Sequence, residues 1–136
     1  MTSKEYLERI GNLERKINAM KMRSAEYDRM SLSIPGPSYG ERIGSNPNRN
    51  TEAPFLKWLM KKDEIDREIE KLEKKLKDMQ AEALLKIEEL DNEDYKNVLV
   101  MRYIKYLSWE EICKSLYAAR RTIMRWHEKA LELITV

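Results

Sequence analysis

The sequence predicts an all-α fold in which a long helical hairpin or coiled-coil arm is joined to a small C-terminal three-helix domain of the helix-turn-helix type. Apolar residues recur at alternating steps of three and four over most of the chain, which is the spacing of one face of an α-helix. Charged residues make up 37% of the sequence, against about 25% in an average globular domain, as expected for long solvated helices. Three of the four glycines and three of the four prolines fall in one short stretch, which separates two helical regions. The expected segments are an N-terminal amphipathic helix at 1–30, a Pro/Gly-rich linker or loop at 31–53, a long coiled-coil-like helix at 54–90 and a helix-turn-helix domain at 91–136.

The first helix is expected from about Ser3 to Met30. Thr2 and Glu5 form a capping box, in which each side chain can satisfy a free backbone amide of the first turn. A narrow apolar seam with one polar position follows, made of Tyr6, Ile10, Leu13, Ile17, Met20, Ser24 and Tyr27. Such a seam requires another helix, and the partner is either the second long helix of the same chain or a separate protein or second copy.

The stretch from Ser31 to Ala53 favours turns and extended backbone. It is not a phosphate-binding loop of the Walker type, because it lacks the Gly-Lys-Ser/Thr signature and a preceding strand. Its apolar residues Ile34, Tyr39 and Ile43 would be able to hold it against the helices. The sequence leaves open whether this segment is a linker or a structured loop.

The second long helix is expected to begin at Pro54, with Thr51 as its cap, and to run to about Leu90. Phe55, Trp58 and Leu59 are expected to open its apolar face. The seam continues through Ile65, Ile69, Leu72, Leu76, Met79, Ala83, Ile87 and Leu90. At about 1.5 Å per residue the helix would be roughly 55 Å long, more than a small domain can cover. It therefore needs a helical partner, in an antiparallel hairpin or in a dimeric coiled coil.

The C-terminal region is expected to hold three short helices. The first, about Glu93 to Lys105, follows a break at Asp91 and Asn92. Ser108 and Glu111 form a second capping box, so the next helix begins at Trp109. The last helix is expected near 119–134. The predicted core is Leu99, Tyr103, Leu107, Trp109, Ile112, Leu116, Ile123, Trp126 and Leu131, with Ala130 and the small Cys113 also facing inward.

The last helix presents a basic face near its N-terminus. Because Ile123 and Trp126 face inward, the outward positions are Arg120, Arg121, Met124, Arg125 and Glu128. Ala119 lies at the N-terminal end of this helix. Three arginines on the exposed half of a second helix favour contact with the major groove of DNA. Lys105 and Lys114 are candidates for phosphate contacts. A merely solvated basic face is the alternative.

The charge distribution agrees with this interpretation. Residues 94–136 hold eight Lys or Arg against five Asp or Glu, whereas residues 55–93 hold nine against twelve. The basic surplus therefore lies on the helix-turn-helix segment, although the net charge of the whole chain is only +2.

The pattern RYIKYLSWEEICKSL followed by RRTIMRWHEKAL resembles the helix-turn-helix of sigma-factor region 4. The stretches TSKEYLERIGNLERKI and NRNTEAPFLKWL resemble small phage and prophage regulators of the ArpU/RinA late-gene activator type. The resemblance implies transcription regulation in the bacterial cytoplasm, with base- and phosphate-facing positions at Ala119, Arg120, Arg121, Met124 and Arg125. The chain departs from this pattern in two places: Tyr117 stands where Gly is usual, at a turn position that favours positive φ, and Ala119 stands where Ser or Thr often caps the helix.

No residue pattern suggests an enzyme or a cofactor. The single histidine, His127, has no metal-ligand spacing around it and is expected on the helix surface or half-packed. The single cysteine, Cys113, falls on a core-like position, which suits a reducing cytoplasm. No stretch approaches the 18 apolar residues of a membrane helix. The expected partners are double-stranded DNA and, through the arm, a second copy or RNA polymerase. The alternative function is a helical phage assembly or packaging adaptor that resembles a small terminase subunit, or another protein-interaction module.

Overall fold

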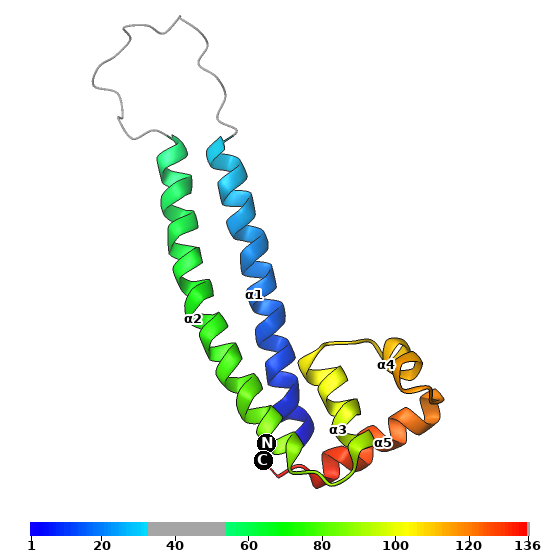
Figure 1. The fold of residues 1–136 in the computed structure, drawn as a ribbon. Helices are drawn as coiled ribbons and strands as arrows, with labels where there is room; N and C mark the ends of the chain where they lie inside the picture. The colour runs from blue at the N-terminus through cyan, green and yellow to red at the C-terminus, as the bar shows by residue number, and fades with distance from the viewer. Residues whose placement is uncertain (33–53, 136) are drawn as a thin grey trace, which may run out of the picture. The chain divides into compact units, whose positions relative to one another are not determined.

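The computed structural model describes residues 1–32 and 54–135, and within them it is all-α, which confirms the predicted fold class. These residues form five α-helices and a π-helical segment and contain no strand (Figure 1). They belong to two compact units, and both long helices, α1 (Ser3–Leu32) and α2 (Pro54–Glu88), contribute to each. Unit 1 comprises Met1–Lys16 and Glu73–Val136, and unit 2 comprises Ile17–Leu72. No helix in the described ranges has the length and apolar character needed to span a membrane.

Unit 2 is built on the pairing of α1 with α2. The rings of Tyr27 and Trp58 lie 5.8 Å apart, and the Ser24 hydroxyl donates a hydrogen bond to the Asp66 carboxylate. Because the later position on α1 contacts the earlier position on α2, the helices are antiparallel here within one chain. Ser24 is the single polar position of the predicted seam, and its bond to Asp66 satisfies its hydroxyl in a buried position.

Unit 1 contains the other halves of the two helices. The Thr2 and Glu5 capping box is confirmed: the Glu5 amide donates to the Thr2 hydroxyl at 3.1 Å, and the Thr2 amide donates to the Glu5 carboxylate at 3.4 Å. Much of the predicted seam of both units is buried, namely Ile10, Ile17, Met20, Ser24, Ile65, Ile69, Leu76, Ala83, Ile87 and Leu90. Leu7 is also fully buried, although the seam pattern passed over it in favour of its neighbour Tyr6, which is half-buried.

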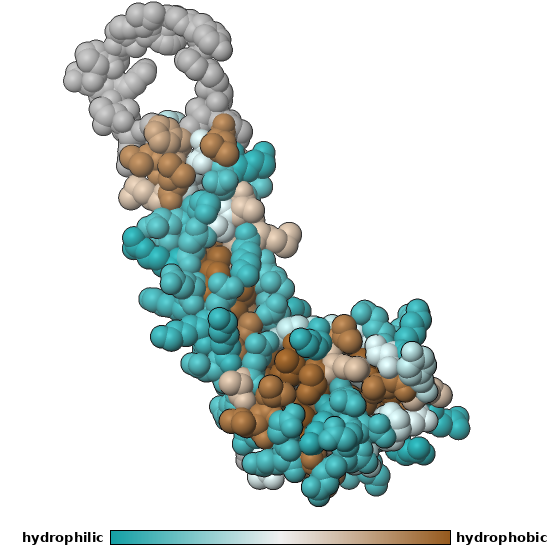
Figure 2. Space-filling model, in the orientation of Figure 1, coloured by the Kyte–Doolittle hydropathy of each residue, from teal (hydrophilic) through white to brown (hydrophobic). Residues whose placement is uncertain are grey.

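The beginning of α2 differs from the prediction. Phe55 and Leu59, expected to open the inward face, are at least 40% exposed, as are Leu56 and Met60. Figure 2 shows apolar side chains gathered on the surface where α2 begins. At about 100° per residue, Leu56, Leu59 and Met60 lie roughly 80° or more around the helix from the buried Ile65 and Ile69. The proposed cap Thr51 and the loop residues Ile34, Tyr39 and Ile43 lie outside the described residues.

The third predicted helix is shorter in its α-helical part than expected. It begins as predicted after Asn92, whose side chain accepts hydrogen bonds from two backbone amides, and α3 spans Glu93–Leu99. The chain then continues as η1, a π-helical segment at Val100–Ile104. Its end is marked by the Lys105 amide, which bonds the Val100 carbonyl five residues earlier, at 2.9 Å, rather than the one four residues earlier.

The last two helices, α4 (Trp109–Leu116) and α5 (Arg120–Leu133), pack against α3 and η1. The Ser108 cap is confirmed, since the Glu111 amide donates to its hydroxyl at 3.2 Å. The centre of the core is Val98, Ile112 and Ile123. Half-buried residues pack around this centre, and they include four predicted core residues, Leu107, Trp109, Leu116 and Trp126, together with Cys113. Leu99 and Tyr103 are buried as predicted, whereas Leu131 is only half-buried.

Candidate nucleic-acid interface

A three-residue turn joins α4 to α5, which is the local geometry of a helix-turn-helix. Tyr117 ends α4 in the left-handed conformation, with φ 52° and ψ 46°, so the turn has the backbone geometry that Gly usually supplies, despite the departure in sequence. The Ala118 amide bonds the Cys113 carbonyl at 3.2 Å and closes the turn. Ala119 then takes the N-cap position in extended conformation, and its side chain makes no cap hydrogen bond. The first amides of α5 therefore remain free to bind an external acceptor.

One face of α5 holds the helix in place. Ile123, His127 and Ala130 are buried at steps of four and three residues. At 3.6 residues per turn, this inward face leaves the opposite side of the helix to solvent.

A basic row occupies that opposite side. Arg121, Arg125 and Lys129 are exposed and stand four residues apart, so they follow one another along the helix. Arg120 is exposed beside the beginning of the row. Lys129 was not among the predicted site residues, although its four-residue spacing from Arg125 was visible in the sequence.

Arg120 and the basic row have no ion-pair partner among the residues that the structure describes. Exposed ion pairs are common on helices of this composition, and α2 alone holds two at spacing i,i+4. The positive charge on the N-terminal half of α5 is therefore available to an anionic ligand.

The remaining predicted site residues take three different positions. Met124 is half-buried and lines a pocket rather than sharing the outward basic face, which corrects its predicted orientation. Lys114 is exposed on α4, 3.7 Å from Glu110, and borders a shallow hollow beside the turn together with Tyr117. Lys105 is exposed at the end of η1, and no described contact links it to α5.

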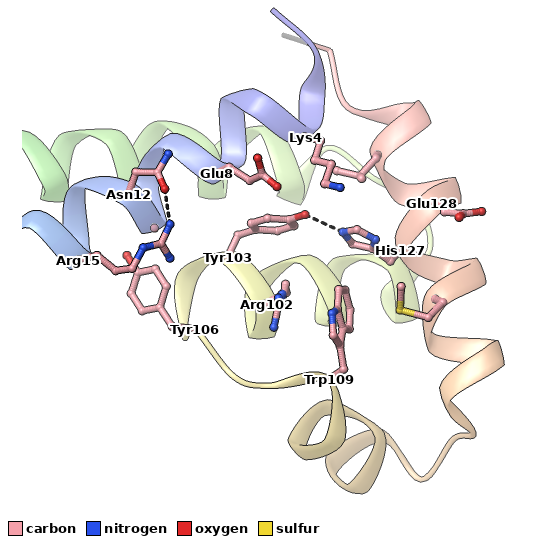
Figure 3. Close-up of a pocket in the computed structure, with 13 residues that line it drawn as sticks. Lys4, Glu8, Asn12, Arg15, Arg102, Tyr103, Tyr106, Trp109, His127 and Glu128 are labelled. Atoms are coloured by element: carbon pink, nitrogen blue, oxygen red, sulfur yellow. Dashed lines mark hydrogen bonds between the residues drawn. The ribbon is translucent and has the colours of Figure 1, made fainter.

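The pocket that Met124 lines lies within unit 1 and has a volume of about 770 Å³. Figure 3 shows polar and aromatic side chains from α1 and from the C-terminal helices around this space, with Glu128 pointing away from it. α1 contributes Lys4, Glu8, Gly11, Asn12 and Arg15, while the C-terminal helices and their connections contribute Arg102, Tyr103, Tyr106, Trp109, Met124, His127, Glu128 and Leu131.

A buried hydrogen bond lies at one side of this pocket. The Tyr103 hydroxyl is 2.7 Å from Nε2 of His127 (Figure 3). His127 is 5% exposed, which corrects the expectation of a surface or half-packed histidine. Its ring also meets Trp109 edge to face, with centroids 4.8 Å apart. Hydrophobic periodicity did not identify it, because that pattern counts apolar residues and histidine is polar.

Burial keeps both members of this pair neutral. It lowers the pKa of His127 to about 4, with the positive charges of Lys4 and Arg102 acting in the same direction. It raises the pKa of Tyr103 to about 12, helped by the negative charge of Glu8. Neither group changes charge near neutral pH, so the pair is suited to holding η1 against α5 rather than to acid–base chemistry.

Arg102 fixes the entry to α4. Its guanidinium lies 4.4 Å from the centroid of the Trp109 ring, and its Nη1 donates to the Leu107 carbonyl at 3.1 Å. These contacts connect η1 with the loop before α4 and so help to orient the helix pair. No group of three or more His, Cys, Asp or Glu side chains with metal-binding geometry occurs in the described part of the chain.

The comparison with protein families gives one result. Residues 42–135 match the family described as Protein of unknown function (DUF1492). The chain belongs to this family. No curated protein and no solved structure shows significant similarity to the chain.

The region that matches DUF1492 contains the helix-turn-helix. It covers all of α2 and the C-terminal helices, and therefore the whole basic row on α5. It excludes α1, which supplies one wall of the pocket. The helix-turn-helix thus lies inside the family region, whereas the pocket combines family and non-family residues.

Proposed function

We propose that this protein is a DNA-binding transcription regulator in which α5 enters the major groove. The observation that carries the proposal is the row of Arg121, Arg125 and Lys129, exposed and without ion pairs in the described structure, on a helix anchored by a helix-turn-helix core. Arginine binds guanine through two hydrogen bonds, and cations near the groove displace counterions from phosphates.

The positions of the cations suggest a division of roles. Arg121 and Arg125 lie on the outward side of α5 and would read base edges, while Arg120 at its beginning would reach either a base or a phosphate. Lys114 borders the turn and Lys105 ends η1, positions from which long side chains would contact the flanking backbone. Phosphate contacts set the register of the protein on DNA, and base contacts supply specificity.

The sequence resemblance extends this proposal to a biological setting. The similarity to sigma-factor region 4 and to the ArpU/RinA type of late-gene activator supports a phage or prophage regulator that acts in the cytoplasm of the bacterial host. Membership in DUF1492 is compatible with this setting. A regulator of this type would also contact RNA polymerase or a second copy of itself through the helical arm.

Fluorescence anisotropy with labelled DNA from the region adjoining the gene tests the proposal. The protein is titrated at two salt concentrations, and Arg121→Ala is compared with Lys77→Ala, which removes the same charge from an exposed position on α2. We expect binding that weakens steeply with salt and an affinity loss of about 1 to 3 kcal/mol for Arg121→Ala on the preferred site. Lys77→Ala should bind as the wild type does. Absence of wild-type binding at low salt would refute the proposal.

A second candidate function rests on a different surface. The exposed apolar residues at the beginning of α2, Phe55, Leu56, Leu59 and Met60, favour contact with another protein. They would suit dimerisation, or a helical phage assembly or packaging adaptor that acts through protein contacts. Light scattering coupled to gel filtration separates these cases, since a ring-sized assembly supports a packaging adaptor and a monomer or dimer supports a regulator.

A further inference from the structure

Two tyrosines of the C-terminal region have left-handed backbone conformation. Tyr106 has φ 58° and Tyr117 has φ 52°, and they are the non-glycine residues with positive φ among those described. Residues with a Cβ atom disfavour this region, and Asn, Asp and Gly populate it most readily. A tyrosine at such a position therefore carries a conformational cost that a glycine would avoid.

Tyr106 has compensating contacts inside the protein. Its hydroxyl accepts a hydrogen bond from Nε2 of Gln80 at 2.9 Å. Its ring packs beside Gly11, where an added Cβ would lie 3.9 Å from a ring carbon. The side chain is 37% exposed and lines the pocket of unit 1. Packing and hydrogen bonding thus account for the conformation of Tyr106.

The side chain of Tyr117 has no such contacts, although its backbone amide bonds the Cys113 carbonyl at the end of α4. Its side chain is 95% exposed, and it makes no hydrogen bond, ring contact or ion pair with any described residue. It borders the shallow hollow formed with Cys113, Lys114 and Ala118. The turn between α4 and α5 accounts for the left-handed backbone, but no described contact accounts for a large aromatic side chain in solvent at this position.

We propose that Tyr117 is a DNA backbone contact whose hydroxyl donates a hydrogen bond to a phosphate beside the groove that α5 occupies. This inference rests on the proposed function. Tyr117 lies two residues before Ala119, the N-cap residue of α5. It borders the same shallow hollow as the cation of Lys114. Phosphate oxygens are strong acceptors, and tyrosine hydroxyls are among the side-chain groups that bind them in protein–DNA complexes. The ring supplies reach beyond the turn that a glycine or asparagine would lack.

If Tyr117 binds a phosphate, loss of its hydroxyl should change DNA binding in a specific way. A phosphate contact carries no sequence information, so its loss weakens binding to preferred and unrelated DNA by the same factor. The hydroxyl is neutral, so its loss leaves the salt dependence of binding unchanged. Both features distinguish Tyr117 from Arg121, whose loss changes discrimination between sequences and the salt dependence.

The test compares Tyr117→Phe and Tyr117→Asn with the control Tyr106→Phe, which removes the same hydroxyl from the other left-handed tyrosine. Affinity is measured by anisotropy on preferred and unrelated duplexes, and melting temperature by circular dichroism. We expect both Tyr117 variants to bind each duplex about tenfold more weakly than the wild type. Tyr117→Asn should melt at or above the wild-type temperature, because asparagine tolerates the left-handed region. Tyr106→Phe should keep its DNA affinity.

The outcomes separate this inference from the proposed function. If the wild type binds DNA and the Tyr117 variants bind it equally well, the inference is overturned and the regulator proposal stands. If Tyr117→Phe changes only the preference between sequences, the phosphate role is also overturned. If the wild type binds no DNA, both proposals fail together.

Discussion

The Tyr103 hydroxyl lies 2.7 Å from Nε2 of His127 in the interior of unit 1. This contact joins η1 to α5, the helix that presents the basic row. A buried nitrogen with a single described polar partner is sensitive to that partner's loss. The orientation of α5 therefore depends on a polar pair as well as on the apolar cluster around Ile123.

Removal of this hydroxyl should destabilise the protein measurably. Tyr103→Phe leaves Nε2 of His127 buried without its partner, and the expected loss is about 1 to 3 kcal/mol in the free energy of unfolding. Tyr95→Phe is the matched control, because Tyr95 is half-buried on α3 and its hydroxyl makes no hydrogen bond in the described structure. Urea unfolding followed by circular dichroism measures both. Equal stability of the two variants would show that the pair contributes little.

The protonation of His127 provides a test of its burial. Because it is the single histidine in the sequence, its ring proton signals in an NMR titration need no assignment. We expect a midpoint of about 4 in the folded protein, well below the ordinary value of 6.5. A midpoint between 6 and 7 would contradict a buried, desolvated ring.

The same pKa difference predicts how stability depends on pH. The unfolded chain takes up this proton near pH 6.5, whereas the folded protein takes it up only near pH 4. The contribution of His127 to stability is therefore retained above about pH 6.5 and is lost as pH falls toward 4. At about 1.4 kcal/mol per pKa unit, the loss attributable to His127 is at most about 3.5 kcal/mol. Urea unfolding of the wild type and of His127→Gln between pH 7 and pH 4 isolates this contribution. If the free energy of unfolding depends on pH identically in the two proteins, His127 is not the source of the pH dependence.

The apolar centre of the C-terminal core should respond as a packed interior does. Ile123 is fully buried between α3 and α4, and Ile123→Ala should cost about 2 to 5 kcal/mol. Arg125→Ala, two positions away on the exposed side, should change stability by less than about 0.5 kcal/mol. Chemical unfolding of the two variants checks the assignment of the inner and outer faces of α5, and a large loss for Arg125→Ala would reverse it.

Local signals in the sequence predicted the helix boundaries that depend on capping. The Thr2–Glu5 and Ser108–Glu111 pairs act at the helix starts where they were expected. These features depend on a few neighbouring residues, so a single sequence contains the information. The seams on α1 and α2 were predictable for the same reason, since their period follows from helix geometry.

The features that sequence reasoning missed depend on contacts between distant residues. The polar side chain of His127 can be buried because its ring nitrogen meets the hydroxyl of Tyr103, 24 residues away. The π-helical segment before Tyr106 has no propensity signal of comparable strength. Met124 turns toward the pocket because that side of α5 faces α1 residues of unit 1, which no local pattern could indicate.

The salt dependence of DNA binding tests the central proposal most directly. The logarithm of the binding constant is plotted against the logarithm of salt concentration for the wild type and for Arg121→Ala/Arg125→Ala/Lys129→Ala, with circular dichroism to confirm that the variant is folded. If each of these cations neutralises one phosphate or lies close to one, the variant's slope should be shallower by about 0.9 for each, or roughly 3 in total. Equal slopes and equal affinities for the two folded proteins would contradict DNA recognition by α5.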